Sequence, residues 1–171
     1  LNDVLDFSKI EAGRLDIESI SFSLEDVLGP VLDVAGFGAA EKRLELLLDV
    51  AVDVRARYCG DPARIGQILL NLVSNAIKFT PEGGVIAELT RAPGGQSGVV
   101  LTVRDTGVGM DEETVQRLFT RFYQADNSLR RRIGGTGLGL EISRNLARMM
   151  GGDIQVTSQL GVGSVFTVHL D

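Results

Sequence analysis

The sequence has one cysteine and no long apolar run, and each shortage excludes a class of protein. Cys59 stands alone, which excludes an internal disulfide framework and a cysteine-based metal site and fits a reducing compartment. No apolar stretch approaches the about 20 residues that cross a bilayer, and no signal peptide is visible. We therefore expect a cytoplasmic domain, and a membrane anchor elsewhere in the parent protein stays open.

Basic residues are also scarce. The 17 Lys and Arg residues against 23 Asp and Glu residues give a formal net charge of -6 and a pI near 4.8. A nucleic-acid binder needs a basic excess to neutralise phosphates, so nucleic acid is not an expected partner. The one dense basic cluster is Arg130-Arg131-Arg132. With 44% hydrophobic residues, the 171-residue chain can build the core of one domain, with room for a fragment of another.

The chain opens with LNDVLDFSKIEAG and has no initiator Met, so we expect a segment of a longer protein. Leu1, Val4, Leu5 and Ser8 share one helical stripe, and Gly13 is a stop signal. The first 12 residues are therefore predicted to be the end of a helix.

Apolar periodicity and turn residues divide the rest of the chain into helices and strands. The helix at 24–42 is weakened by Gly29, Pro30, Gly36 and Gly38. The mixture lacks strict strand–helix alternation, which favours an α+β two-layer sandwich with helices on one sheet face. The expected strands lie at 17–24, 44–50, near 58, 85–91, 99–104, 153–158 and 164–170, and the expected helices at 24–42, from 61 on, 112–119 and 138–150.

The stretch NLVSNAIKFT places polar residues inside an apolar helix that begins with Asp61 as N-cap and Pro62 at its first position. Asn71, Asn75 and Lys78 fall in a stripe roughly 60° wide beside the apolar face. Amide oxygens are hard ligands that suit Mg²⁺, and a lysine one turn on can neutralise phosphate. A plain amphipathic helix with a polar flank is the alternative.

Two glycine-rich segments carry further ligand chemistry. In DTGVGM, Asp105 can accept from an exocyclic amine, while Gly107 and Gly109 let the backbone pass close to a flat ring; an ordinary strand-to-loop turn is the alternative. GGTGLGL, residues 134–140, opens a helix whose first N–H groups can bind phosphate oxygens. It fits neither the dinucleotide-binding G-x-G-x-x-G spacing nor a Walker loop. In LFTRFYQAD, the i, i+3 pair Phe119 and Phe122 taken alone indicates core packing.

In this order and spacing, the motifs resemble those of the ATP-binding catalytic domain of sensor histidine kinases, in the GHKL superfamily of Bergerat-fold ATPases. NLVSNAIKFT is similar to the N box, DTGVGM to the first glycine box, LFTRFYQAD to the F box and GGTGLGL to the second glycine box. LNDVLDFSKIEAGRL resembles the end of the dimerisation and phosphoacceptor helix. The resemblance implies such a helix end at 1–16 and a catalytic domain at 17–171, with a mobile lid at about 110–134, most similar to hybrid-type kinases.

The resemblance also implies roles for single residues. Asn75 is expected to coordinate Mg²⁺ with help from Asn71, and Lys78 to contact phosphate, so these three are the candidate catalytic residues. Phe79 is expected to pack on the nucleotide, and Asp105, supported by Gly107 and Gly109, to bind the adenine amino group. Ser164 is expected near adenine. The residues expected to wrap the phosphates are Gly135, Thr136, Gly137, Leu138 and Gly139.

Arg132, with Arg130 and Arg131, lies in the expected lid and is a candidate for the γ-phosphate, with a solvated charge run as the alternative. Related ATPases of this fold carry a general-base glutamate at the position of Asn71. Asparagine cannot take that role, so the site is expected to hold ATP without rapid hydrolysis and to pass its γ-phosphate to a protein histidine. One departure from the family pattern is Glu141, where a small residue is common.

The single histidine, His169, is predicted to be an exposed strand residue and not the phosphoacceptor. The expected partners are therefore ATP, a dimerisation and phosphoacceptor domain of the same protein, and a response-regulator receiver domain. We expect this fragment to be monomeric and unable to autophosphorylate, and the full-length kinase to be a homodimer. A nucleotide-binding pseudokinase or regulatory module and a same-fold ATPase are the alternatives.

Overall fold

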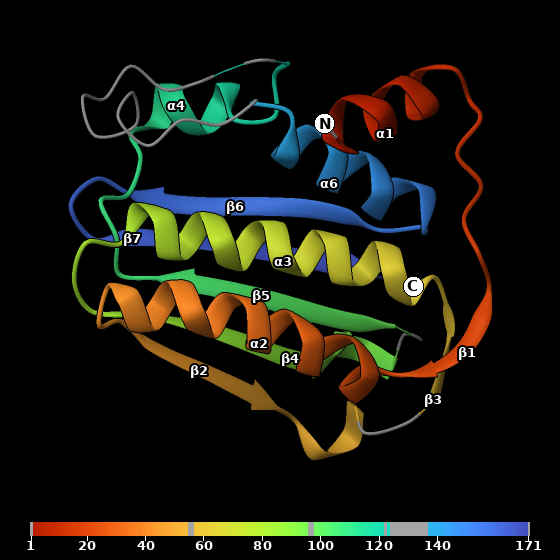
Figure 1. The fold of residues 1–171 in the computed structure, drawn as a ribbon, viewed down its shortest axis with the longest axis horizontal. Helices are drawn as coiled ribbons and strands as arrows, with labels where there is room; N and C mark the ends of the chain where they lie inside the picture. The colour runs from red at the N-terminus through yellow and green to blue at the C-terminus, as the bar shows by residue number, and fades with distance from the viewer. Residues whose placement is uncertain (1, 55–56, 96–97, 122, 124–136, 171) are drawn as a thin grey trace.

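Alternating apolar residues build a five-stranded sheet that forms one layer of the fold (Figure 1). The computed structural model describes residues 2–54, 57–95, 98–121, 123 and 137–170. In spatial order the strands are β2 (Glu45–Val50), β4 (Gly84–Arg91), β5 (Val99–Asp105), β7 (Gly163–Leu170) and β6 (Asp153–Gln159). β2 is parallel to β4, and every other neighbouring pair in this sheet is antiparallel. The predicted hairpin of β4 and β5 is confirmed.

A separate two-stranded sheet pairs β1 (Ile20–Ser23) with β3 (Arg57–Gly60). The strand expected at 17–24 is shorter than predicted, because the chain before Ile20 is irregular and Leu24 already starts a helix. Only one of its two apolar residues faces the core: Phe22 is buried, whereas Ile20 is 49% exposed.

Helices cover one face of the larger sheet, as the sequence predicted (Figure 1). α3 (Pro62–Phe79) packs over β4 and β5, and α6 (Gly139–Met149) packs over β6 and β7. α2 (Leu24–Glu41) lies against α3, and α4 (Glu112–Arg117) lies near β6. Two single turns of 3-10 helix, at Val52–Val54 and Pro93–Gly95, complete the described elements. The α+β two-layer sandwich is therefore confirmed.

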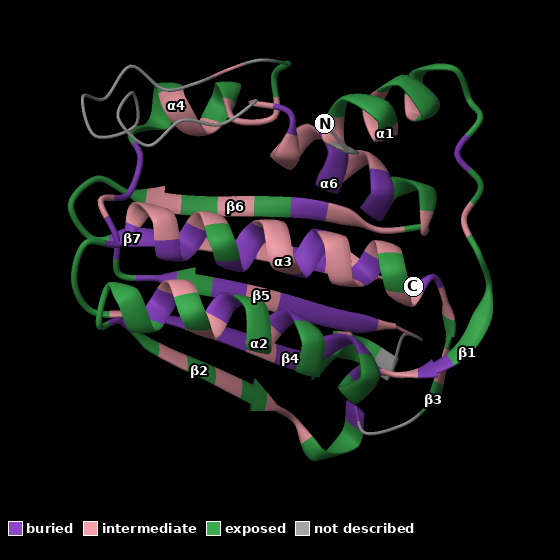
Figure 2. Ribbon diagram, in the orientation of Figure 1, coloured by how far each residue is buried: buried purple, intermediate pink, exposed green. Residues whose placement is uncertain are grey.

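The core lies between the sheet and α3, where Figure 2 shows buried positions along the helix and the central strands. Asp61 caps α3 by accepting from the N–H of Arg64 at 3.0 Å, as predicted. The same carboxylate accepts from the N–H of Glu18 at 3.1 Å and is only 3% exposed. Asp61 thus ties the segment before β1 to the start of the central helix.

α1 (Asn2–Glu11) packs beside α6 (Figure 1) and confirms the helix predicted for the first 12 residues. Val4 and Leu5 are 52% and 57% exposed, while Phe7 and Ile10 pack against the core. No helix among the described residues is long and apolar enough to cross a membrane.

Candidate functional site

Asp105 forms one end of the candidate site, at the point where β5 leaves the sheet. Its side chain is buried, and Oδ1 accepts from the N–H of Gly107 at 2.8 Å and from the N–H of Ser164 at 3.3 Å. Ser164 is the register partner of Asp105 on β7, so the sheet itself holds the two together. The structure therefore places the predicted Asp105 and Ser164 side by side.

Gly107 lies where only a glycine fits. A Cβ added there would lie 2.4 Å from the carbonyl oxygen of Phe79 and 2.9 Å from both Asp105 Oδ1 and Thr80 Oγ1. The next residue, Val108, donates its N–H to the same Phe79 oxygen at 3.2 Å. The turn after β5 is thus in direct contact with the C-terminal end of α3.

Both the backbone conformation and the close packing at Gly109 require a glycine. Its φ is +65°, which L side chains rarely adopt, and an added Cβ would lie 1.9 Å from the carbonyl oxygen of Gln159. The following N–H, of Met110, donates to Ser158 Oγ at 2.8 Å, and Ser158 also pairs with Ser164 Oγ at 2.9 Å. DTGVGM is therefore a fixed main-chain turn, not a loose loop.

Asn71 forms the other end of the site, two turns earlier on α3. Its Nδ2 donates to Ser143 Oγ of α6 at 2.9 Å, and its Oδ1 accepts from Asn75 Nδ2 at a long 3.5 Å. A Cβ on Gly139 would lie 2.6 Å from this Oδ1. The bond to Ser143 turns the amide oxygen toward Asn75 and the first residue of α6, which suits a hard cation or its bound water.

Lys78 and Phe79 are the last two residues of α3, next to the Gly107 turn. Both are half-buried, and the Lys78 ammonium lies 5.3 Å from the centroid of the Phe79 ring. Burial lowers the pKa of Lys78 from its ordinary value. An ammonium group with reduced hydration gains more from a phosphate partner than one in open water.

The start of α6 has the features expected of an anion-binding turn. Gly137 adopts φ +70°, and Leu138 is 1% exposed at the N-cap, where no side chain makes a capping hydrogen bond. The positive end of the helix dipole at Gly139 thus lies next to Asn71. Five predicted ligand residues fall outside the described part of the chain: Arg130, Arg131, Arg132, Gly135 and Thr136.

Several contacts were missed from the sequence. Ser143 lies one turn after Gly139 on α6, and this i, i+4 spacing was the available signal for its contact with Asn71. The guanidinium of Arg144 pairs with Asp153 at 2.8 Å and lies 4.6 Å from the centroid of the Phe119 ring. Phe119 is thus partly buried under an arginine, while Phe122 lies outside the described residues. No sequence pattern connects these distant positions.

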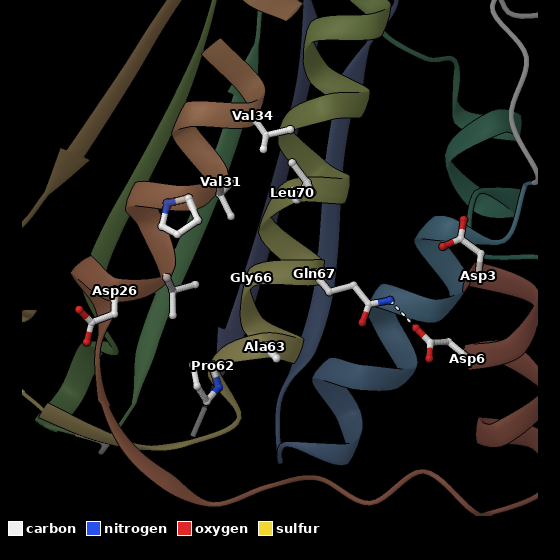
Figure 3. A pocket seen from close by; sticks show the side chains of 12 residues that line it. Asp3, Asp6, Asp26, Val31, Val34, Pro62, Ala63, Gly66, Gln67 and Leu70 are labelled. Atoms are coloured by element: carbon white, nitrogen blue, oxygen red, sulfur yellow. Dashed lines mark hydrogen bonds between the residues drawn. The ribbon is translucent and has the colours of Figure 1, made fainter. Parts of the chain in front are cut away.

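Two hollows lie beside the site. One, about 250 Å³, is lined by Asn71, Gly139 and Ser143 and also by Asp3 of α1. The other, about 700 Å³, is a groove between α1, α2 and α3 that Figure 3 shows in close-up. The larger groove contains none of the predicted ligand residues.

His169 is half-buried, so it is less exposed than the sequence predicted. It does alternate with the buried Phe166 and Val168, as predicted. The described residues hold no group of three or more His, Cys, Asp or Glu side chains placed to bind a metal.

The helix-covered mixed sheet thus places a buried carboxylate, Asp105, beside the C-terminal end of α3 and the start of α6 beside Asn71, two turns earlier on the same helix. The chain belongs to the family of histidine kinase-, DNA gyrase B- and HSP90-like ATPases, which matches residues 60–171.

The relatives are sensor kinases. Sensor histidine kinase GacS of Pseudomonas protegens is 48% identical across 100% of this chain, and BarA of Escherichia coli is 46% identical across 100% of it. This chain spans only 19% of either protein. Full-length ShkA, solved with AMPPNP, aligns over 99% of this chain and 34% of its own with a TM-score of 0.85 and 34% identity. The ThkA catalytic domain shares the fold at a TM-score of 0.74 and 24% identity, over 91% of this chain and 97% of its own.

Proposed function

We propose that this chain is the ATP-binding catalytic domain of a sensor histidine kinase, which transfers the γ-phosphate of ATP to a histidine on a dimerisation domain. The main supporting observation is that α3 contacts both ends of the candidate site, and that these two ends differ in their chemistry. Its last residue touches the Gly107 turn beside Asp105, and Asn71, about 12 Å away along the helix, touches Gly139 at the start of α6. One end suits a base and the other suits a chain of phosphates. ShkA, similar over nearly the whole chain, holds an ATP analogue.

At the base end, Asp105 accepts the exocyclic amine of adenine. The main-chain donors of Gly107 and Ser164 fix the carboxylate orientation before the nucleotide arrives, so little order is lost on binding. Gly107 and Gly109 leave room for the flat ring, and Phe79 packs along the nucleotide. A guanine base presents a carbonyl oxygen where adenine presents the amine, and a carboxylate repels it.

At the phosphate end, Asn75 and Asn71 hold Mg²⁺ through their amide oxygens, and Lys78 contacts phosphate. The ion, when bound, neutralises charge on the phosphate oxygens. Gly137, Leu138 and Gly139 present the positive start of α6. Asn71 has no basic group to activate water, and its amide is held by Ser143, so the residues favour transfer to a positioned protein acceptor over hydrolysis.

The remaining assignments rest on this function. Residues 1–16 are the end of a phosphoacceptor-domain helix, and residues 17–171 are the catalytic domain. The histidine that receives the phosphate lies in the dimerisation domain, and a receiver domain takes the phosphate from it. His169 is unsuited as the acceptor because it is a half-buried position within β7.

Titration calorimetry with AMPPNP, with and without Mg²⁺, tests the proposal. The wild-type chain should bind in the presence of Mg²⁺, and Asn75→Ala and Asp105→Asn should each lose at least tenfold in affinity. Asp49→Asn removes an exposed carboxylate from β2 and should change nothing. Incubation with ATP and a separately prepared phosphoacceptor domain should then label that domain. Binding without labelling indicates a regulatory nucleotide-binding module, and rapid ATP hydrolysis by the chain alone indicates an ATPase.

A further inference from the structure

Glu141, in the first turn of α6, has an unusual environment. Its side chain is 13% exposed, and one carboxylate oxygen lies 3.1 Å from Arg121 Nε. The other oxygen, Oε2, is buried and has no hydrogen-bond partner. A buried carboxylate oxygen without a partner is costly, so Arg121 must supply most of the compensation.

Arg121 also forms an ion pair with a second carboxylate, that of Glu11. Its Nη1 lies 2.5 Å from Glu11 Oε1 on α1, and its guanidinium lies 5.1 Å from the centroid of the Phe7 ring. The Coulombic attraction of Glu11 is the largest influence that raises the pKa of Arg121. One guanidinium, on the segment after α4, is thus shared by carboxylates of two different helices.

α1 is held by polar contacts in addition to the packing of Phe7 and Ile10 against the core. Besides Glu11, Asp6 accepts from Arg64 at 3.2 Å and from Gln67 at 2.8 Å, the latter drawn in Figure 3. Ion pairs at partly exposed positions are weak and are screened by salt. The Arg121–Glu11 pair, with side chains 56% and 47% exposed, is of this kind.

The charge of this cluster depends on whether α1 is in place. Glu11, Glu141 and Arg121 together carry a net charge of about -1, whereas Glu141 and Arg121 without Glu11 carry none. Glu141 lies two residues after Gly139, where the positive end of the α6 dipole favours anions. A net negative cluster at this position opposes phosphate binding, and a neutral one does not.

We propose that Arg121 is a positioning residue through which the docking of α1 weakens triphosphate binding at the start of α6. With Glu11 present, the guanidinium is divided between two helices and leaves Glu141 only partly neutralised. When Glu11 withdraws, Arg121 is available to both oxygens of Glu141, and the start of α6 binds phosphate more tightly. This inference rests on the proposed function and adds a control of nucleotide affinity by the position of α1.

The test measures Mg·AMPPNP affinity by calorimetry on the 171-residue chain at low salt. Glu11→Gln should tighten binding about two- to fivefold, the range typical of one charge near a helix terminus. Glu113→Gln is the matched control, since it removes the same charge from an exposed i, i+4 pair with Arg117 on α4, and it should leave the affinity unchanged. The gain in Glu11→Gln should also shrink at high salt.

Arg121 variants separate this coupling from a purely structural role. Arg121→Gln should weaken binding, and Glu11→Gln in the Arg121→Gln background should have little further effect. Arg121→Lys keeps the charge and should recover at least half of the lost affinity. Equal affinities for Glu11→Gln and Glu113→Gln, or unchanged affinity in Arg121→Gln, overturn the inference while leaving the proposed function intact. No binding by the wild-type chain overturns both.

Discussion

The two ends of the candidate site are built from different parts of the chain. At Asp105 the contacts are main-chain donors and backbone atoms of Phe79 and Gln159, packed with no room for a single added carbon. At Gly139 the contacts are side chains: the Asn71 amide, the Ser143 hydroxyl and, two residues further along α6, the Glu141–Arg121 pair. Main chain within a sheet moves little, whereas side chains rotate. The base end is thus rigid, and the phosphate end is adjustable.

The largest effect should come from adding a methyl group to the rigid end. Gly107→Ala places Cβ against the backbone oxygen of Phe79, which can move only if α3 or the turn moves. We expect a loss of about 2–3 kcal/mol in the free energy of unfolding, measured by urea denaturation, and loss of nucleotide binding. Gly36→Ala, on α2 with open space around it, is the control and should stabilise by about 0.5–1 kcal/mol. Equal stability of the two variants would contradict a rigid base end.

The same change at the adjustable end should separate binding from stability. Gly139→Ala places Cβ 2.6 Å from Asn71 Oδ1, the far end of a side chain that can rotate. We expect less than about 1 kcal/mol of change in unfolding free energy, but at least a tenfold loss in Mg·AMPPNP affinity, because Asn71 leaves its position. If stability falls as far as in Gly107→Ala, the contrast between the two ends does not hold.

A smaller effect is expected from the protonation of Lys78. Burial lowers the pKa of Lys78 below its ordinary value of 10.5, and only the charged ammonium attracts phosphate. The affinity for Mg·AMPPNP should therefore be at its highest near neutral pH, where Lys78 is charged. It should fall as the pH rises through the lowered pKa of Lys78. Calorimetry at a series of alkaline pH values measures this. Lys78→Gln should bind more weakly and lose the dependence, and an unchanged pH profile in that variant would exclude Lys78 as its cause.

The smallest effect concerns Asp153, at the far end of α6. Hydrogen bonds from Arg144, with further ones from Ile154 N–H and Arg148, hold the pKa of the Asp153 carboxyl well below its ordinary value of 3.8. The depressed pKa contributes stability that is present above about pH 4, the range for an unfolded aspartate, and is lost as the pH falls further. Because Asp153 is 39% exposed, we expect about 1 kcal/mol at most.

Asp153→Asn should remove this part of the pH dependence of unfolding, measured by urea denaturation between neutral pH and pH 3. Asp49→Asn, from the exposed edge strand, is its control. A steeper acid slope in Asp153→Asn than in the wild type would contradict the assignment.

Residues with a local physical signature could be predicted from the sequence. The Asp61 cap, the buried face of α3 and the α+β arrangement follow from neighbouring residues, and the structure confirms them. α2 forms despite Pro30 and its glycines because Ser23 and Asp26 make a capping box and its apolar face is buried. The positions of Asp105, Gly107 and Gly109 were predicted through their motif, while their roles in binding stay predictions.

Contacts between distant elements could not be predicted in this way. Ser143 meets Asn71 only because α6 crosses the start of the site, and Arg121 meets Glu11 only because α1 packs beside α6. α1 shows the same limit: the shared stripe of Val4 and Leu5 predicted the helix, but the fold turns Phe7 and Ile10 inward. Periodicity tells which residues share a face, and packing decides which face is covered.

The central claim, that one nucleotide spans the site from the Gly107 turn to Asn71 and Gly139, is tested most directly by titrating the isotopically labelled chain with Mg·AMPPNP and following backbone amide resonances. The account predicts that Gly107 and Ser164 at one end, and Gly139 and Asn71 at the other, shift together with a single dissociation constant. If the two groups saturate at different concentrations, or only one of them shifts, a single nucleotide does not join them and the assignment is wrong.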